Sequence, residues 1–202
     1  WQGNLLAEGF YTDLDDVFAL RELGFEDGIL IKERHNESGA SVFGANLEGK
    51  AAYKNIFQIQ MGLTVQNSRY KEARSWAEDV QAVRNMFRTP DFHGYFTASY
   101  NPVKELTLAM TGTYTGSMLV EHHAGMIAQN VTVMTPDFWD MGFKAAYNFK
   151  LYKSFNLEVN AGVQNIMNSF QNDFDSGADR DSGYMYGPTL PRTFFLGVKL
   201  AY

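Results

Sequence analysis

The residues of this chain that are best suited to chemistry lie in stretches without a regular pattern. His122 and His123 are adjacent, and two imidazoles can bind a metal ion or a haem iron. Neighbouring side chains of an extended chain point to opposite sides, however, so adjacent histidines seldom share one ion. The sequence therefore favours a solvated loop at this position, with ligand binding as the alternative.

Four carboxylates are crowded into the stretch that precedes the C-terminal segment. At this density they could hold Ca²⁺. Their spacing differs from that of an EF-hand loop, because Gly177 and Ala178 stand where ligands would be needed. A solvated acidic loop is therefore favoured over a calcium site. The four carboxylates are Asp173, Asp175, Asp179 and Asp181.

A third group combines arginine with aromatic residues. Guanidinium groups beside aromatic rings suit an anionic ligand that carries rings of its own. The same side chains suit packing between loops equally well, and both interpretations stay open. We expect a short helix over residues 72–86 within this stretch. The group consists of Arg69, Tyr70, Trp76, Arg84 and Arg88.

The composition excludes several classes of protein. The 202 residues carry a formal net charge of −6, with a pI of about 5.2, so the chain lacks the basic surface that nucleic acid requires. Without cysteine, neither disulfides nor thiolate chemistry can contribute. No serine-centred elbow flanks any of the four histidines, and we expect neither enzymatic activity nor a cofactor.

The elements that must position these residues are strands. Between Phe57 and Val65 apolar and polar residues alternate, which is the period of a β-strand with two different faces. Seven other segments repeat the pattern, although Leu6 and Phe10 break it in the first. The eight segments are 4–12, 43–53, 56–68, 92–100, 106–114, 139–149, 155–163 and 193–202.

The charged residues of these segments all fall in the polar phase. A Lys or Arg that faces lipid near the midplane costs about 2–4 kcal/mol, so this placement indicates strands with one face in a bilayer. We therefore predict an all-β fold, an antiparallel transmembrane β-barrel segment of about eight up-and-down strands. The charged residues are Glu8, Glu48, Lys50, Asp140, Lys144, Glu158 and Lys199.

The connections support an outer-membrane barrel. Long stretches without regular structure are uncommon in compact domains, but outer-membrane barrels combine short periplasmic turns with long extracellular loops. Aromatic residues stand at both ends of the predicted strands, as in the girdles of such barrels. The expected short turns are 53–55, 101–105 and 150–154, and the expected long loops are 19–38, 69–90, 119–136 and 165–191.

The last strand ends the sequence on an aromatic residue. Its large apolar residues share one phase; the other phase is small or charged, apart from Phe195. An unpaired apolar edge invites aggregation in a soluble sheet, whereas a strand that closes a barrel would end in this way. We expect a fragment, because the sequence also begins in the middle of a predicted strand. The residues of the apolar phase are Phe194, Leu196, Val198, Leu200 and Tyr202.

These motifs resemble those of one protein family. Residues 187–202 resemble the last strand of TonB-dependent outer-membrane receptors, and residues 160–168 resemble their penultimate strand with its G-x-x-N-I-x-N pattern. Residues 87–91, 112–116 and 33–39 look most like the Bacteroidetes members of that family. The resemblance covers the whole chain.

The resemblance implies a fold, a location and a set of partners. Residues 1–202 would be the last eight strands of a 22-stranded barrel, as one incomplete domain without the N-terminal plug. The whole receptor would take up a scarce nutrient complex, such as an iron-siderophore, haem or cobalamin, across the cell outer membrane. Its partners would be outer-membrane lipid, the TonB-ExbB-ExbD system through the missing plug, and the barrel-assembly machinery, which would read the aromatic last strand as its signal.

Two other functions remain open on the sequence. A free-standing eight-stranded outer-membrane barrel with a structural or adhesive role is the main alternative. Small residues on the polar face, such as Gly44, Gly62 and Gly162, favour a wider barrel, because eight-stranded barrels fill their interior with side chains. An outer-membrane hydrolase that uses His122 or His123 is the least favoured interpretation.

Overall fold

The computed structural model describes residues 1–152 and 154–201, apart from the side chains of Glu22, Phe25 and Leu30. Every element assigned within these residues is a β-strand. The described residues contain no helix that is long and apolar enough to cross a membrane, a finding that concerns helices alone.

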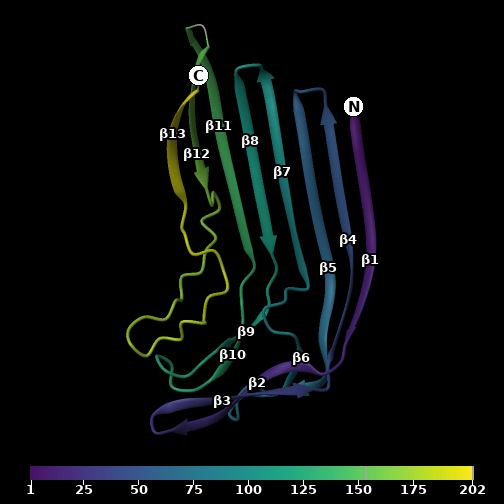
Figure 1. Cartoon of the computed structure of the whole chain (residues 1–202), viewed down its shortest axis with the longest axis vertical. Helices are drawn as coiled ribbons and strands as arrows, with labels where there is room; N and C mark the ends of the chain where they lie inside the picture. Colours follow the sequence, from purple (N-terminus) through teal and green to yellow (C-terminus); the bar gives the residue numbers. More distant parts are fainter. Residues whose placement is uncertain (153, 202) are drawn as a thin grey trace.

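Eight long strands form one antiparallel sheet, as the alternating pattern predicted (Figure 1). Their order across the sheet follows the chain, and each is paired with its neighbour in antiparallel register. The strands are β1 (Gln2–Leu14), β4 (Ala40–Tyr53), β5 (Phe57–Arg74), β7 (Phe92–Val103), β8 (Leu106–Thr115), β11 (Phe138–Tyr152), β12 (Phe155–Gln164) and β13 (Thr193–Ala201).

The register brings the predicted apolar phases of all eight strands onto one face. Leu47 of β4 lies opposite Leu63 of β5, and Val159 of β12 lies opposite Val198 of β13. Many of these side chains are exposed to solvent although they are large and apolar. An apolar face of this extent requires an apolar environment, which a bilayer provides.

The opposite face carries hydrogen-bonded polar side chains. Asn46 Nδ2 donates to Glu8 Oε2 at 3.1 Å, and Thr64 Oγ1 donates to Asn46 Oδ1 at 2.8 Å. These bonds link β1, β4 and β5 across the sheet. Lys144 and Glu158 also approach each other on this face, with 3.9 Å between Nζ and Oε1.

Aromatic rings on the polar face lie over glycines of the neighbouring strand. A Cβ built on each of these glycines would lie between 2.4 and 2.7 Å from the ring opposite it. This arrangement covers the glycine backbone with an aromatic ring, and it explains two residues that broke the alternation. The pairs are Phe10 with Gly44, Tyr95 with Gly62, and Phe195 with Gly162.

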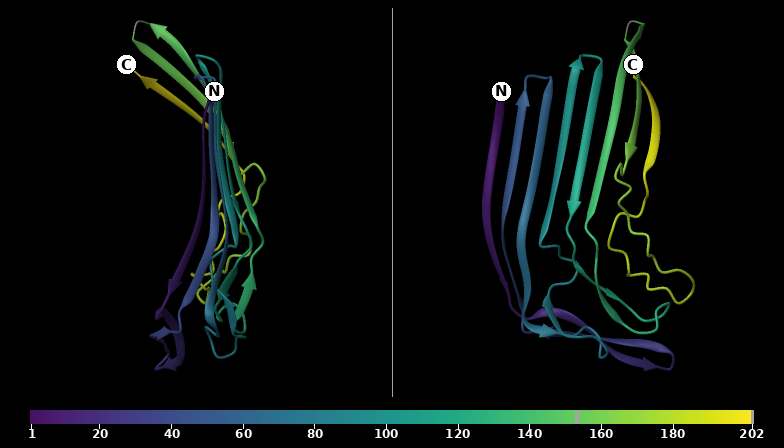
Figure 2. Two further views of the ribbon diagram at one scale, coloured as in Figure 1. Left: turned by 90° about the vertical axis from the view of Figure 1, so that its right-hand side faces the viewer. Right: turned by 180° about the vertical axis from the view of Figure 1, so that it is seen from behind.

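The sheet is open. Its order begins with β1 and ends with β13, so these two strands form its edges rather than pairing with each other. Figure 2 shows the curved and twisted sheet from its side and from behind. The predicted barrel segment is therefore present without closure in the described residues, and Tyr202 lies outside them.

All the long connections emerge at one end of the sheet, and the tight turns lie at the other (Figure 1). Several long connections contain short strands. The first forms a hairpin of β2 (Val17–Glu26) and β3 (Ile29–Glu37), and the third forms one of β9 (Leu119–His122) and β10 (Val131–Met134).

The helix expected over residues 72–86 is wrong. β5 continues to Arg74, and β6 (Val83–Asn85) pairs with it, while the residues between them form turns and bends. Trp76 and Ala77, which lie within that range, are buried in loop packing. Contacts with distant residues, such as that of Trp76 with Thr132, have outweighed local preference here.

Candidate ligand-binding loops

Three long loops pack together at one end of the sheet. We call residues 75–91, 116–137 and 165–192 the second, third and fourth loops, and all three together the loop cluster. Asp79 of the second loop accepts hydrogen bonds from the backbone nitrogen and side-chain Nδ2 of Asn130 in the third, at 3.2 and 2.9 Å. Arg88 of the second donates to the carbonyls of Met185 and Gly183 in the fourth, at 2.8 and 2.6 Å. Hydrogen bonds therefore join the three loops into one packed unit.

His122 lies at the centre of the loop cluster. Its Nε2 lies 2.9 Å from Asp175 Oδ1, with side chains only 9% and 1% exposed, respectively. Its ring stacks on Tyr184, with centroids 3.6 Å apart and an angle of 8° between the planes. The solvated loop expected here is thus wrong for His122, because the fourth loop covers it.

His123 points to other neighbours than His122, as expected for adjacent residues of an extended chain. Its ring contacts Trp76 edge-on at 4.7 Å between centroids, and its backbone nitrogen donates to Asp181 Oδ2 at 2.9 Å. Trp76 is 3% exposed, and its Nε1 donates to Thr132 Oγ1 at 3.0 Å. The two histidines therefore brace different contacts between loops.

Three of the four candidate carboxylates in the fourth loop accept hydrogen bonds from protein donors. Asp173 accepts hydrogen bonds from the hydroxyls of Tyr184 and Tyr186. The Asp175 carboxylate accepts one from the backbone nitrogen of Asp181. The Asp181 carboxylate in turn accepts one from the backbone nitrogen of Gly183. Among the described residues no three His, Cys, Asp or Glu side chains are grouped to hold a metal ion. The calcium interpretation therefore finds no support, and Asp179 stays exposed.

The titration of this network follows from its contacts. Burial would raise the pKa of Asp173, but the bonds from Tyr186 and Tyr184 outweigh it and hold the pKa below the usual value. Burial and the bond to Asp173 raise the pKa of Tyr184 to about 12, and they raise the pKa of Tyr186 as well. The ionised Asp173 and the neutral tyrosines therefore stabilise each other.

Three members of this network, Gln171, Tyr184 and Tyr186, were not anticipated from the sequence. Gln171 is 1% exposed, and its Nε2 donates to the Tyr184 carbonyl at 3.0 Å while its Oε1 accepts from the Tyr186 nitrogen at 2.8 Å. The tyrosines gain their partners by closure of the fourth loop on itself. No periodicity marks such residues, although two tyrosines close to several carboxylates were a compositional hint.

The arginine and aromatic group is also held by protein contacts. Arg69 pairs with Asp91, with 3.3 Å between Nη2 and Oδ2, and Arg84 Nε donates to the Tyr70 carbonyl at 3.1 Å. The guanidinium carbon of Arg74 lies over the Tyr70 ring, 4.6 Å from the centroid of the ring. Loop packing thus accounts for these contacts, and ligand binding by the group stays a prediction.

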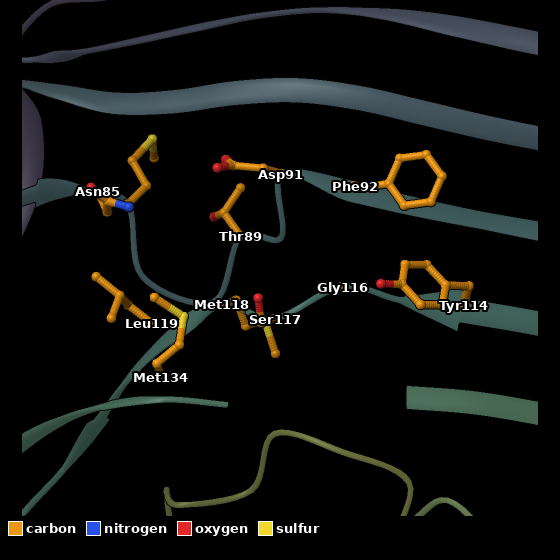
Figure 3. A pocket seen from close by; sticks show the side chains of 11 residues that line it. Asn85, Thr89, Asp91, Phe92, Tyr114, Gly116, Ser117, Met118, Leu119 and Met134 are labelled. Atoms are coloured by element: carbon orange, nitrogen blue, oxygen red, sulfur yellow. The ribbon is translucent and has the colours of Figure 1, made fainter. Parts of the chain in front are cut away.

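Two cavities border the loop cluster. One of about 200 Å³ lies at the base of the second and third loops, between Asp91, Ser117 and Met134 (Figure 3). Another of about 400 Å³ lies on the polar face of the sheet, between Asp140 and the segment 188–191 of the fourth loop. Polar side chains dominate the second cavity, so it suits a polar ligand or a polar protein segment.

Comparisons with known proteins show what this arrangement is similar to. No family model matches the chain. The catecholate siderophore receptor Fiu of Escherichia coli strain K12 is 25% identical over 144 residues, which are 71% of this chain and 17% of that protein. Fiu of Escherichia coli O157:H7 matches equally well. The chain thus spans about a sixth of the curated relatives it matches.

Solved structures share the fold. The ferric-catecholate import receptor Fiu from Escherichia coli K12 matches 97% of this chain with a TM-score of 0.65 and 22% identity, over 25% of its own length. The siderophore receptor PiuA from Acinetobacter baumannii matches 97% with a TM-score of 0.60 and 18% identity, over 26% of its length. The copper transporter OprC matches 97% with a TM-score of 0.57 and 14% identity, over 28% of its length. The fold of this chain, an antiparallel sheet with long loops at one end, therefore matches about one quarter of each of these receptor and transporter chains.

Proposed function

We propose that this chain is the C-terminal part of the β-barrel of a TonB-dependent outer-membrane receptor that imports a ferric siderophore of the catecholate class. The observation that carries the proposal is the single apolar face across eight strands, with every long loop at one end. The similarity to a catecholate siderophore receptor over 71% of the chain favours the iron-siderophore class over haem or cobalamin.

The open edges support a part of a larger barrel over a free-standing one. β1 and β13 stand at opposite edges of the sheet, and Leu5 and Leu196 near those edges are each 75% exposed. A transmembrane sheet must satisfy its edge groups by closing. We infer that further strands of the same barrel, in the portion that the relatives have and this chain does not, pair with both edges.

The partners follow from this placement. The receptor would lie in the cell outer membrane, and its plug would couple it to the TonB-ExbB-ExbD system. The barrel-assembly machinery would read β13, whose apolar residues Phe194, Leu196, Val198 and Leu200 lie on one face of the strand. The narrower relationship to Bacteroidetes receptors stays a prediction.

We further propose a division of labour among the loop residues. A ferric catecholate is anionic and aromatic, so it suits guanidinium groups and aromatic rings. Arg84 is exposed in the second loop and is the candidate to contact it. His122, His123 and Trp76 would instead position the loops, because their rings are engaged in contacts within the cluster.

The proposal is tested on the full-length receptor in its own host. Deletion of the gene should abolish growth on a ferric catecholate as the sole iron source, and complementation should restore it. Ferric hydroxamates and cobalamin serve as controls, and growth on them should not change. The proposed substrate class would be refuted if the deletion strain grew on every ferric catecholate tested. A growth defect confined to another nutrient would also refute it.

The role of Arg84 needs a matched variant. Arg84→Ala should raise the Kd of the purified receptor for the ferric catecholate, while Arg180→Ala should leave it unchanged. Arg180 is a suitable control because it is exposed in the fourth loop and donates to the Gly177 carbonyl within that loop. Equal Kd values for the Arg84→Ala variant and the wild type would remove Arg84 from the proposed site.

A further inference from the structure

The tip of the third loop lies directly against the fourth loop (Figure 1). The backbone nitrogen of His123 donates to Asp181 Oδ2 at 2.9 Å. A Cβ built on Gly125 would lie 2.3 Å from the Asp179 carbonyl oxygen, so the two backbones are in contact at that position. We call this contact between residues 123–126 and residues 176–181 the loop seam.

Met126 joins the loop seam through its sulfur. The backbone nitrogen of Ser176 donates a hydrogen bond to Met126 Sδ at 3.3 Å, and Met126 is 48% exposed. A thioether sulfur is a weak acceptor, and its acceptor strength depends on its oxidation state. Because the sulfur lies at the surface, an oxidant in the surrounding solution can reach it.

The other exposed methionines of the loop cluster are not placed in this way. Met134, Met167 and Met185 are each more than half exposed. Within the part of the chain that the structure describes, Met126 is the methionine whose sulfur accepts a hydrogen bond. An oxidant would therefore reach all four side chains, but at Met126 it would also change a contact between two loops.

The hydrogen bond gives the oxidation of Met126 a preferred side. When hydrogen peroxide reacts with a thioether, a sulfur lone pair attacks one peroxide oxygen and the O–O bond breaks. The departing hydroxide takes the proton of the transferred oxygen and leaves as water. Addition to one or the other of the two sulfur lone pairs gives the two sulfoxide epimers. Since the Ser176 N–H is directed at one lone pair, the oxygen should add to the other, and one epimer should predominate.

The added oxygen should weaken the loop seam. It enters on the side of the sulfur opposite Ser176, so it points away from the Ser176 N–H and towards solvent. It also withdraws electrons from the sulfur, which then presents a partial positive charge to the N–H. The hydrogen bond between Ser176 and Met126 is therefore lost, and reduction of the sulfoxide restores it.

We propose that Met126 is a modification site, at which oxidation to one epimer of methionine sulfoxide loosens the third loop from the fourth. Contact with oxidants outside the cell follows from the proposed placement in the outer membrane. The site does not depend on which nutrient is imported, and it is distinct from Arg84, which is assigned above to the nutrient.

Hydrogen exchange of the full-length receptor before and after peroxide treatment tests the site. Oxidation should make the Ser176 amide exchange about two- to tenfold faster, because it loses one hydrogen bond. Met126→Leu nearly keeps the side-chain volume but removes the sulfur, so its Ser176 amide should exchange fast from the start and peroxide should not change it. Met167→Leu is the matched control, because it removes an equally exposed sulfur outside the loop seam, and it should behave as the wild type.

The epimer is a second and independent measurement. The methionine sulfoxide reductases MsrA and MsrB each reduce one epimer. Applied to peptides from the oxidised receptor and followed by mass spectrometry, one of them should reduce most of the Met126 sulfoxide and the other little. The Met167 sulfoxide should be reduced by both, because no hydrogen bond to its sulfur favours one side.

Each outcome decides the proposal. Faster exchange at Ser176 in the oxidised wild type, with no further change in Met126→Leu and with one epimer at Met126, supports it. Unchanged exchange at Ser176, a peroxide effect of the same size in Met126→Leu, or equal amounts of the two epimers would overturn it. Met126 that stays reduced while Met167 is oxidised would also overturn it. No readout involves nutrient uptake, so failure of this site leaves the proposed import function standing.

Discussion

Arginine substitutions at two adjacent positions of β5 should have very different effects on the stability of the intact barrel. Leu63 is on the apolar face, between Leu47 and Gly94 of the neighbouring strands, and it is 39% exposed. Thr64 follows it at almost the same depth but faces the polar side, where its hydroxyl donates to Asn46. Depth is thus matched, and only the face differs.

The magnitude follows from the depth of Leu63. Val65, two residues further along, is paired with Phe92, an aromatic residue at the loop end of β7, so Leu63 lies about 7 Å along the strand from the level of Phe92. Arginine costs about 2–4 kcal/mol at the midplane and about 0–1 near the interface. We therefore expect Leu63→Arg to lower the free energy of unfolding by about 2 kcal/mol.

The cost of Thr64→Arg should be smaller. It removes one hydrogen bond, which contributes about 0.5–1.5 kcal/mol. The new guanidinium would lie near Asn46 and close to Glu8, which Asn46 contacts, and that attraction offsets part of the loss. Denaturant unfolding of the full-length receptor in lipid vesicles measures both variants. Equal losses, or a larger loss for Thr64→Arg, would refute the assignment of the two faces.

Four further variants probe the packing of loops and sheet. His122→Ala removes the contact with Asp175 and should speed hydrogen exchange in residues 165–192 without affecting the strands; unchanged exchange there would contradict the packing. Gly62→Val forces a ring aside and should destabilise the barrel by about 1–3 kcal/mol, whereas Gly49→Ala meets only ordinary contacts and should be neutral by the same unfolding assay. The pKa of Tyr184 is raised from 10.0 to about 12, so its contribution to loop stability is present below pH 10 and is lost as pH rises through 12. Tyrosinate absorbance should show this late ionisation in the wild type, and a curve that is identical in Tyr184→Phe would exclude it.

The sheet was predictable because its signal is local and repeated. Alternation fixes which residues share a face of each strand, and pairing then joined residues such as Leu47 and Leu63 with no further information. Two of the exceptions to the alternation are explained by the pairing of the strands. Phe10 and Phe195 stand in the polar phase, and each is opposite a glycine, although the pairing that reveals this is a property of the register.

The loops were much less predictable, because their contacts join residues that are distant in the chain. His122 and Asp175 are separated by 53 residues, so the sequence around either residue gives no signal that the two side chains form a buried pair. The expected helix failed for the same reason, since Trp76 is buried against Thr132 of another loop. Two side chains that were candidate ligands, His122 and Trp76, make contacts between loops, and ligand binding by the loop residues stays a prediction.

Iron uptake by the intact receptor tests the proposed function most directly. Cells that express the full-length protein as their single receptor for a ferric catecholate should accumulate radioactive iron from that complex, and accumulation should cease when TonB is removed. Uptake that persists without TonB, or binding of the ferric catecholate that is absent in both strains, would contradict an energised siderophore receptor.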